Sequence, residues 1–224
     1  MRFGIQKRQG FDKLSPNGDL MSKSVVALID YGAGNLQSVR NALKAAGAAD
    51  IRVTADPDVV RAADRIVLPG VGAFAHCKQA LWGIDGMIDA LEESTGAGGK
   101  PFLGICVGMQ LMAEAGEEHG RHEGLGWVPG TVRLLEPSDP AIKIPHMGWN
   151  DVIPAVPHPL IEAGEAYFLH SFAFEGEGVL ASTRHGAEVT AAIGIGNRVG
   201  VQFHPEKSQR YGLALLERFL AWAP

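Results

Sequence analysis

The chain has 224 residues, of which 46% are hydrophobic and 20% are charged, and its formal net charge is −5. This is the composition of a globular protein, and the length suits one domain with a real core better than two catalytic domains. A mildly acidic chain gives no electrostatic reason to expect nucleic acid or an anionic membrane, and no apolar run reaches the roughly 18 residues that cross a bilayer. Two cysteines and an N-terminus without an apolar secretory segment favour a cytoplasmic protein.

The first segment, residues 1–22, differs from the rest because it is polar, contains Gly10, Pro16 and Gly18, and has no apolar period. We expect a disordered leader there, with a native edge strand or arm as the alternative. The single predicted domain therefore covers residues 23–224.

From residue 25 onward, strand-like and helix-like segments alternate. Val25–Ile29 is a continuous apolar run, which is typical of a strand covered on both faces. Asn35 is a good helix N-cap, and apolar residues then recur at helical spacing until Gly47. The other elements expected in this half are strands at 51–54 and 65–68, the second broken by Pro69 and Gly70, a helix between about 73 and 91, and a strand at 102–105.

The second half is richer in short β-like runs. They lie at 131–135, 149–153, 167–174, 179–183, 189–193 and 199–203. Gly196 and Asn197 form the expected turn between the last two runs, and a closing helix has Tyr211, Leu215 and Phe219 on one face. These elements predict a single three-layer α/β domain, with a largely parallel central sheet, helices on both faces and an antiparallel β extension.

The clearest catalytic signal is the sequence Gly-Ile-Cys-Val-Gly at residues 104–108, between an apolar strand and an expected helix. In a strained turn of this kind, flanking glycines leave space for close backbone approach. A helix N-terminus favours the nucleophilic thiolate of Cys106, and the N–H of Val107 is placed to bind an oxyanion. The alternative is a buried structural cysteine, which is also our interpretation of Cys77.

A second signal lies at the end of a late apolar strand, where His204 reaches the edge at which open α/β sheets bind ligands. Pro205 favours an extended His204, so that Glu206 points to the same side as the imidazole. The carboxylate can then accept from Nδ1–H and leave Nε2 for the thiol of Cys106. These residues form a candidate Cys-His-Glu triad. No histidine or cysteine spacing resembles a zinc site, so we expect neither a metal nor a cofactor.

Six segments match the landmarks of a known protein family. They are residues 30–36 (DYGAGNL), 68–74 (LPGVGAF), 104–110 (GICVGMQ), 145–150 (PHMGWN), 167–171 (YFLHS) and 202–208 (QFHPEKS). Across residues 25–222 the chain resembles the class I, triad-type glutamine amidotransferases. Within that family, residues 30–36 and 145–150 are similar to the glutaminase subunits of imidazole glycerol phosphate synthases. The departures are small: Val107 stands where Leu is commoner, and Phe172 where Tyr is common.

The resemblance implies that Cys106 attacks the amide of glutamine, giving ammonia and a glutamyl thioester, and that His204 then assists hydrolysis to glutamate. It also implies a heterodimer with a cyclase subunit, a (β/α)8 barrel that receives the ammonia. That partner would form imidazole glycerol phosphate and an aminoimidazole carboxamide ribotide in histidine biosynthesis. Ammonia protonates in water and ceases to be a nucleophile, which is a physical reason for a closed tunnel between the subunits.

The resemblance assigns roles to further residues. Val71 and Gly72 belong to the implied oxyanion strand opposite Val107. A flip of the peptide plane at Val71 would switch hydrolysis on when the partner binds. The implied glutamine pocket consists of Gly72, Gln110, His170 and Ser171. The implied contacts around the tunnel mouth are Asn35, Trp149, Tyr167 and Lys207, with core packing as the alternative for the two aromatic residues and a solvated charge for the lysine.

Three other functions stay open from the sequence. A glutaminase subunit of another pathway, such as vitamin B6 synthesis, would share the triad but lack residues 145–150. A cysteine-peptidase-like hydrolase on the same turn would cleave peptides or esters. A regulatory binding module that has lost activity would leave Cys106 unlabelled by a reactive glutamine analogue.

Overall fold

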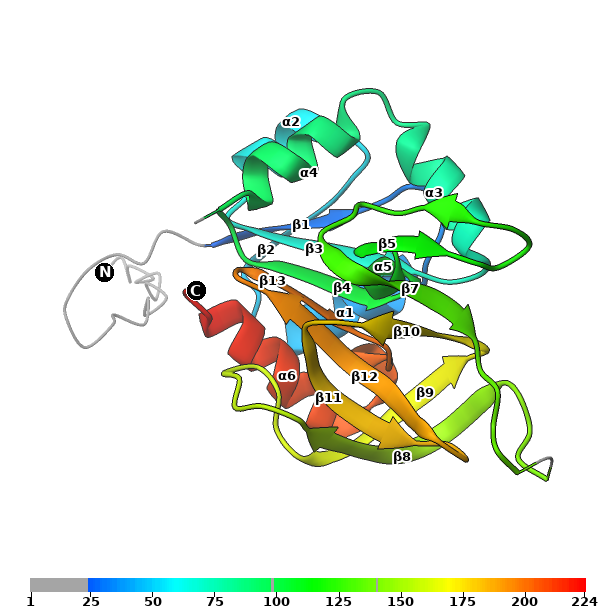
Figure 1. Cartoon of the computed structure of the whole chain (residues 1–224). Helices are drawn as coiled ribbons and strands as arrows, with labels where there is room; N and C mark the ends of the chain where they lie inside the picture. The colour runs from blue at the N-terminus through cyan, green and yellow to red at the C-terminus, as the bar shows by residue number, and fades with distance from the viewer. Residues whose placement is uncertain (1–23, 98, 140) are drawn as a thin grey trace, which may run out of the picture.

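The computed structural model describes residues 24–97, 99–139 and 141–224, so the predicted leader at 1–22 lies outside the described residues. A nine-stranded sheet, in the order β2-β1-β3-β4-β13-β12-β11-β8-β9, forms the centre of the molecule (Figure 1). Its five parallel strands are β2 (Asp50–Thr54), β1 (Val25–Ile29), β3 (Arg65–Gly70), β4 (Phe102–Cys106) and β13 (Arg198–Val201). Its antiparallel strands are β12 (Glu188–Ile195), β11 (Val179–Arg184), β8 (His146–Pro154) and β9 (Gly164–His170).

A second, four-stranded sheet packs beside β12. Its strands are β10 (Phe172–Gly176), β7 (Val128–Leu134), β5 (Ala113–Gly116) and β6 (His122–Glu123). The helical segments are α1 (Leu36–Ala45), α2 (Pro57–Ala62), α3 (Phe74–Trp82), α4 (Met87–Thr95), α5 (Val107–Gln110), the short 3-10 helix η1 (Pro205–Lys207) and α6 (Gln209–Ala221).

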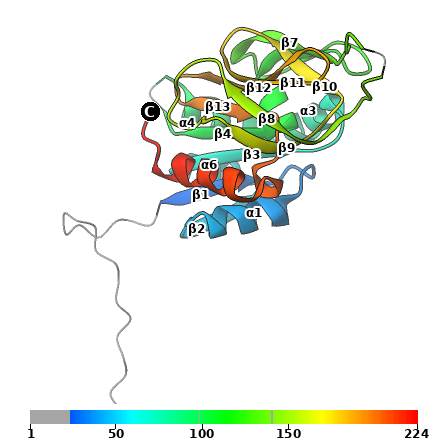
Figure 2. The same ribbon diagram turned by 90° about the horizontal axis from the view of Figure 1, so that it is seen from below.

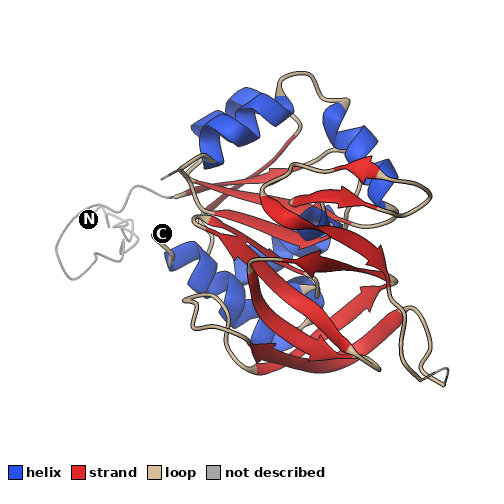
Figure 3. Cartoon of the chain, viewed as in Figure 1, coloured by secondary structure: helices blue, strands red, loops and turns tan. Residues whose placement is uncertain are grey.

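The layers follow from which faces the helices cover. Helices α1 and α6 pack together on one face of the large sheet, while α3, α4 and the small sheet lie on the other (Figure 2). Strands dominate the part of the molecule that contains β8 to β12 (Figure 3). The predicted α/β class, with a parallel sheet between helices and an antiparallel extension, is confirmed.

The central strands are buried as their apolar runs predict. Val26, Leu68 and Phe102, on β1, β3 and β4, have no exposed surface, as expected of strands covered on both faces. Helix α1 begins at Leu36 because Asn35 caps it, with Asn35 Oδ1 accepting from the Ser38 N–H at 3.3 Å. Among the described residues, no helix has the length and apolarity to cross a membrane.

Several predicted boundaries were wrong. The helix expected over 73–91 is two helices, because Gly83 ends α3 and Gly86, with φ +75°, precedes α4. Helix α2 was missed, although Asp56 caps it and Pro57 stands at its first position. The run at 167–174 is two strands in different sheets, β9 and β10.

A further difference lies near the catalytic turn. Strand β3 continues through Pro69 to Gly70, which pairs with Cys106 of β4. The helix expected after Cys106 is present, as the single turn α5.

Candidate active site

Cys106 sits in a strained turn at the end of β4. Its φ of +55° and ψ of −111° are rare for a residue with a side chain. The flanking glycines are required by close packing: a Cβ on Gly104 would lie 2.6 Å from the Gly108 carbonyl oxygen, and one on Gly108 would lie 1.9 Å from the Leu68 oxygen. The predicted need for glycine on both sides of the cysteine is therefore confirmed.

His204 and Glu206 form a buried pair just beyond β13. His204 Nδ1 lies 2.9 Å from Glu206 Oε1, and the two side chains are 3% and 2% exposed. The backbone N–H of His204 donates to the Tyr167 carbonyl at 2.9 Å, which ties this segment to β9. The expected pairing is present, but its expected cause was wrong, because Glu206 reaches the imidazole from the 3-10 helix η1 and not from an extended strand.

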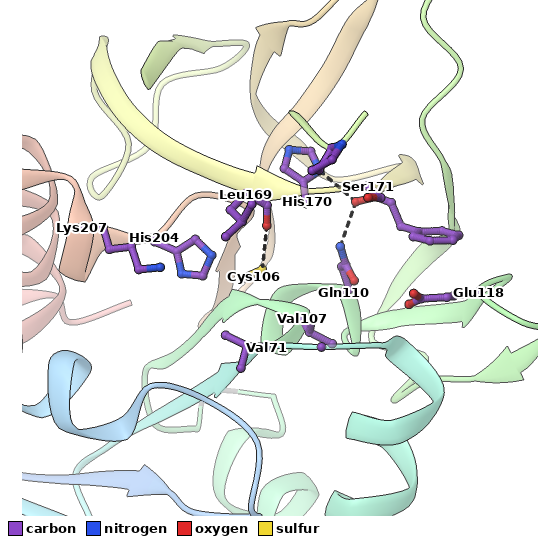
Figure 4. A pocket seen from close by; sticks show the side chains of 13 residues that line it. Val71, Cys106, Val107, Gln110, Glu118, Leu169, His170, Ser171, His204 and Lys207 are labelled. Carbon is purple, nitrogen blue, oxygen red and sulfur yellow. Dashed lines mark hydrogen bonds between the residues drawn. The ribbon is translucent and has the colours of Figure 1, made fainter. Parts of the chain in front are cut away.

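The surroundings of His204 favour its protonated form. Burial alone would lower the pKa of His204, but hydrogen bonds with Cys106 and Glu206 and their negative charges outweigh burial and raise the pKa to about 9. Figure 4 shows the imidazole beside Cys106. At neutral pH the imidazolium can therefore hold a proton next to the sulfur.

A cavity of about 300 Å³ opens over Cys106 and His204. Its lining includes Lys207 and all six residues expected in the oxyanion site and the glutamine pocket. They are Val71, Gly72, Val107, Gln110, His170 and Ser171 (Figure 4). Glu206 lies behind His204 and does not line the cavity. The structure thus brings the candidate nucleophile, base and pocket to one place.

The carbonyls on either side of the Gly70–Val71 peptide are held by side chains. Tyr31 Oη donates to the Pro69 carbonyl at 2.7 Å, and Cys77 Sγ donates to the Val71 carbonyl at 3.4 Å. Burial raises the pKa of the Cys77 thiol to about 11, so this sulfur keeps its proton. Cys77, interpreted from the sequence as structural, is buried against the implied oxyanion strand.

Comparison with known proteins places the chain in a family. Residues 27–222 match the family model described as glutamine amidotransferase class-I. The chain belongs to the class I glutamine amidotransferases.

Curated relatives within this family are similar over nearly their whole length. The imidazole glycerol phosphate synthase subunit HisH of Zymomonas mobilis is 61% identical over 209 residues, covering 91% of this chain and 98% of the relative. The subunit of the same name from Rhodospirillum rubrum is 55% identical over 212 residues, covering 89% and 99%. The amidotransferase described here therefore groups with the HisH subunits.

Solved structures support the fold. The crystal structure of a glutamine amidotransferase superposes with a TM-score of 0.69 at 20% identity, covering 89% of this chain and 99% of that one. The structure of PurLQS from Thermotoga maritima gives a TM-score of 0.67 at 20% identity, covering 90% and 100%. At this identity the likeness shows the fold alone.

Two polar residues of this amidotransferase site were missed by sequence reasoning. Glu118 lines the cavity, and its Oε2 accepts from the Phe74 N–H at 2.8 Å. Gln202 is fully buried, and its Nε2 donates to Cys106 Sγ at 3.7 Å. Gln202 stands in the recognised segment 202–208, two residues before His204, which was an available signal. Nothing in the polar stretch around Glu118 distinguished it from a solvated carboxylate.

Of the residues expected at the tunnel mouth, Lys207 lines the cavity, Tyr167 and Trp149 lie on the paired strands β9 and β8, and the exposed Asn35 caps α1 with its side chain. Trp149 on β8 is 47% exposed, which argues against simple core packing. It meets Tyr167 of β9 edge to face, with ring centroids 6.2 Å apart. Lys207 Nζ lies 5.7 Å from the centroid of the Tyr167 ring, a cation–π contact.

Proposed function

We propose that this amidotransferase hydrolyses glutamine to glutamate and ammonia as the glutaminase subunit of an imidazole glycerol phosphate synthase. The observation that carries the proposal is the position of Cys106, in a strained turn beside the buried His204–Glu206 pair and at the base of a cavity. The HisH relatives of similar length and high identity support the particular pathway.

The proposed reaction proceeds through a thioester. The Cys106 thiolate attacks the side-chain amide carbon of glutamine, and the His204 imidazolium gives its proton to the departing nitrogen, which leaves as ammonia. Neutral His204 then removes a proton from water as the water attacks the thioester, releasing glutamate and the thiolate. Glu206 accepts from Nδ1–H throughout, which keeps Nε2 directed at the sulfur.

Backbone N–H groups would stabilise the oxyanion that forms on the amide oxygen. Val107 is the first residue of α5, where an N–H has no partner within the helix. We propose Val107 as one donor and the Val71–Gly72 segment as the other. Loss of one such donor typically lowers kcat by about 10²–10³-fold.

The rest of the cavity fits a glutamine molecule. Glu118 offers a carboxylate and Gln110 offers its Oε1, and both are acceptors suited to the α-ammonium group of the substrate. We propose that these two residues, with Gly72, His170 and Ser171, bind glutamine. His170 already uses both of its ring nitrogens within the protein, so its contribution comes from its backbone or ring carbons.

The proposed partner is the cyclase subunit, docked over the face that carries Trp149, Tyr167 and Lys207, with Asn35 nearby. Binding of the cyclase would flip the Gly70–Val71 peptide plane and point the Val71 N–H into the oxyanion site. Tyr31 and Cys77 hold the carbonyls on both sides, so they confine the movement to that one peptide. A Val71→Pro variant, which has no N–H, should lose partner stimulation by about 10²–10³-fold, and stimulation equal to wild type would contradict the switch.

Glutamate release from glutamine tests the proposed function. The purified chain should be slow alone and strongly stimulated by a cyclase subunit with its nucleotide ligand, and Cys106→Ala should be inactive in both conditions. Fast hydrolysis that the cyclase leaves unchanged would assign the enzyme to another pathway. No hydrolysis in any condition would contradict the glutaminase proposal.

A further inference from the structure

His146 on β8 and His170 on β9 lie opposite each other in register, and a continuous series of hydrogen bonds runs through them. Asn150 Nδ2 is 3.0 Å from His146 Nε2, His146 Nδ1 is 3.0 Å from His170 Nε2, and His170 Nδ1 is 2.9 Å from the Phe172 carbonyl oxygen. We call this series the histidine chain. Both imidazoles are buried, so an unpaired ring nitrogen would be costly.

The two ends of the histidine chain determine where its protons lie. Asn150 Nδ2 also donates to the Arg184 carbonyl at 2.7 Å, which fixes the orientation of the amide. Nδ2 therefore donates to His146 Nε2, and the proton of neutral His146 lies on Nδ1. At the other end the Phe172 carbonyl can only accept, so His170 carries its proton on Nδ1 and accepts from His146 at Nε2. The assignments made from opposite ends agree.

The histidine chain matches two neutral imidazoles and no other state. A proton added to either ring would place one donor against another within the series. Burial first, and then the neighbouring imidazoles, lower the pKa of His146 to about 3, and burial lowers the pKa of His170 to about 4.

The far end of the histidine chain reaches the cavity. The Phe172 carbonyl accepts a second hydrogen bond from Gln110 Nε2 at 3.0 Å, and Gln110 Nε2 also donates to Gln202 Oε1 at 3.0 Å. With both Nε2 hydrogens used, Oε1 is the atom of the Gln110 amide left to meet a molecule in the cavity that this residue lines. The fixed Phe172 carbonyl thus determines which atom of Gln110 faces a bound molecule.

We propose that His146 and Asn150 are positioning residues for glutamine binding, acting through His170 and the Phe172 carbonyl on Gln110. The inference rests on the proposed function, because it concerns the same pocket. Neither residue lines the cavity, so each acts through others. Loosening the histidine chain should weaken glutamine binding while leaving the chemistry at Cys106 nearly unchanged.

Steady-state kinetics of the complex with the cyclase test this division. The ring of His146 stacks on those of Phe168 and His185, with centroids 4.7 and 4.2 Å apart. His146→Phe keeps this stacking but removes both hydrogen bonds of the imidazole. We expect the KM for glutamine to rise about tenfold, the worth of roughly one buried hydrogen bond, with kcat within about threefold of wild type. His146→Asn, whose amide N–H₂ can replace Nδ1–H, should restore most of the lost binding. The matched control His185→Phe, outside the histidine chain, should keep the wild-type KM.

An unchanged KM in His146→Phe, or an equal loss in His146→Asn, would overturn the proposal. Nitrogen-15 spectra of the full chain without substrate supply an independent readout. Both His146 and His170 should be Nδ1–H tautomers at pH 7, and a proton on Nε2 of either ring would overturn the proposal whatever the kinetics. Absence of hydrolysis by the wild-type complex would instead contradict the proposed function. The tautomers are measured without glutamine, so they test the histidine chain even if the enzyme does not hydrolyse glutamine.

Discussion

The two sides of the cavity are built by different kinds of interaction. On the side of the parallel strands, β3, β4 and α5 hold Cys106 by close backbone approach, and Gly104 and Gly108 leave no space for a Cβ. On the side of the antiparallel strands β8 and β9, buried side chains such as His146 and His170 position the pocket by hydrogen bonds.

The difference lies in what each side tolerates. The backbone side fails when an atom is added, because packed main chain cannot move away. The side-chain side fails when a polar atom is lost or gains a proton, because its partners are left unpaired in the interior. Adding an atom on the backbone side and removing a polar atom on the side-chain side should therefore have different effects on stability and activity.

The largest effect is expected for Gly108→Ala. Its Cβ would lie 1.9 Å from the Leu68 carbonyl oxygen, so β3 and α5 would have to separate. We expect a loss of more than about 4 kcal/mol of unfolding free energy, or failure to fold, measured by urea denaturation. Gly47→Ala is the control, because nothing lies within 4 Å of its Cβ position and only its positive φ of +102°, which Gly108 does not share, opposes a side chain; it should lose only about 1 kcal/mol. Similar losses in the two variants would contradict the packing explanation.

The next effect concerns the His204–Glu206 pair, which lies beside the strained turn at Cys106. Glu206→Gln keeps the shape of the side chain but removes the charge that holds the His204 proton. We expect kcat to fall by about 10²–10⁴-fold, measured with saturating glutamine in the complex with the cyclase. The exposed Glu217→Gln on α6 removes the same charge elsewhere and should leave kcat unchanged.

The pH profile sharpens this prediction. In wild type the imidazolium is lost as pH rises through about 9, so activity should decline there. Without the Glu206 carboxylate the pKa of His204 falls, and the decline should begin at lower pH. An alkaline limb at the same pH in both enzymes would show that Glu206 does not sustain the proton on His204.

The smallest effect is an acid-dependent loss of stability from the histidine chain. His146 and His170 bind protons in the unfolded chain near the ordinary pKa of 6.5, but in the fold only near about 3 and 4. Their contribution to stability is therefore present above pH 6.5 and lost as pH falls. Between pH 6.5 and 5 each should lose about 1.5 kcal/mol, measured by urea denaturation. His146→Phe should remove about half of this acid sensitivity, and the same slope in variant and wild type would contradict neutral burial.

The same contrast explains how far the sequence predicts this molecule. The turn around Cys106 was predictable because an apolar strand followed by a cysteine between Gly104 and Gly108 is a local sequence pattern. The buried apolar strands were predictable for a similar local reason. The pairing of His204 with Glu206 was also expected, but through an extended strand, whereas the chain turns into η1 at Pro205.

What the sequence did not predict depends on contacts between distant segments. His146 and His170 become partners only when β8 pairs with β9, and Gln110 and Gln202 are 92 positions apart along the chain. Glu118 has no local pattern that separates it from other surface carboxylates. The division of the run at 167–174 likewise depends on the two different sheets that β9 and β10 join. The break of the expected helix has a local cause that was overlooked, namely Gly83 and Gly86.

Covalent labelling tests the central claim most directly. A glutamine analogue with an electrophilic carbon in place of the amide should modify the chain once, and peptide mass spectrometry should find the adduct on Cys106. Cys77, whose thiol is buried with a pKa raised to about 11, should stay unmodified, and excess glutamine should protect Cys106. An adduct on Cys77, or a Cys106 that reacts no faster with the analogue than with an electrophile of unrelated shape, would contradict the assignment of Cys106 as the nucleophile of a glutamine site.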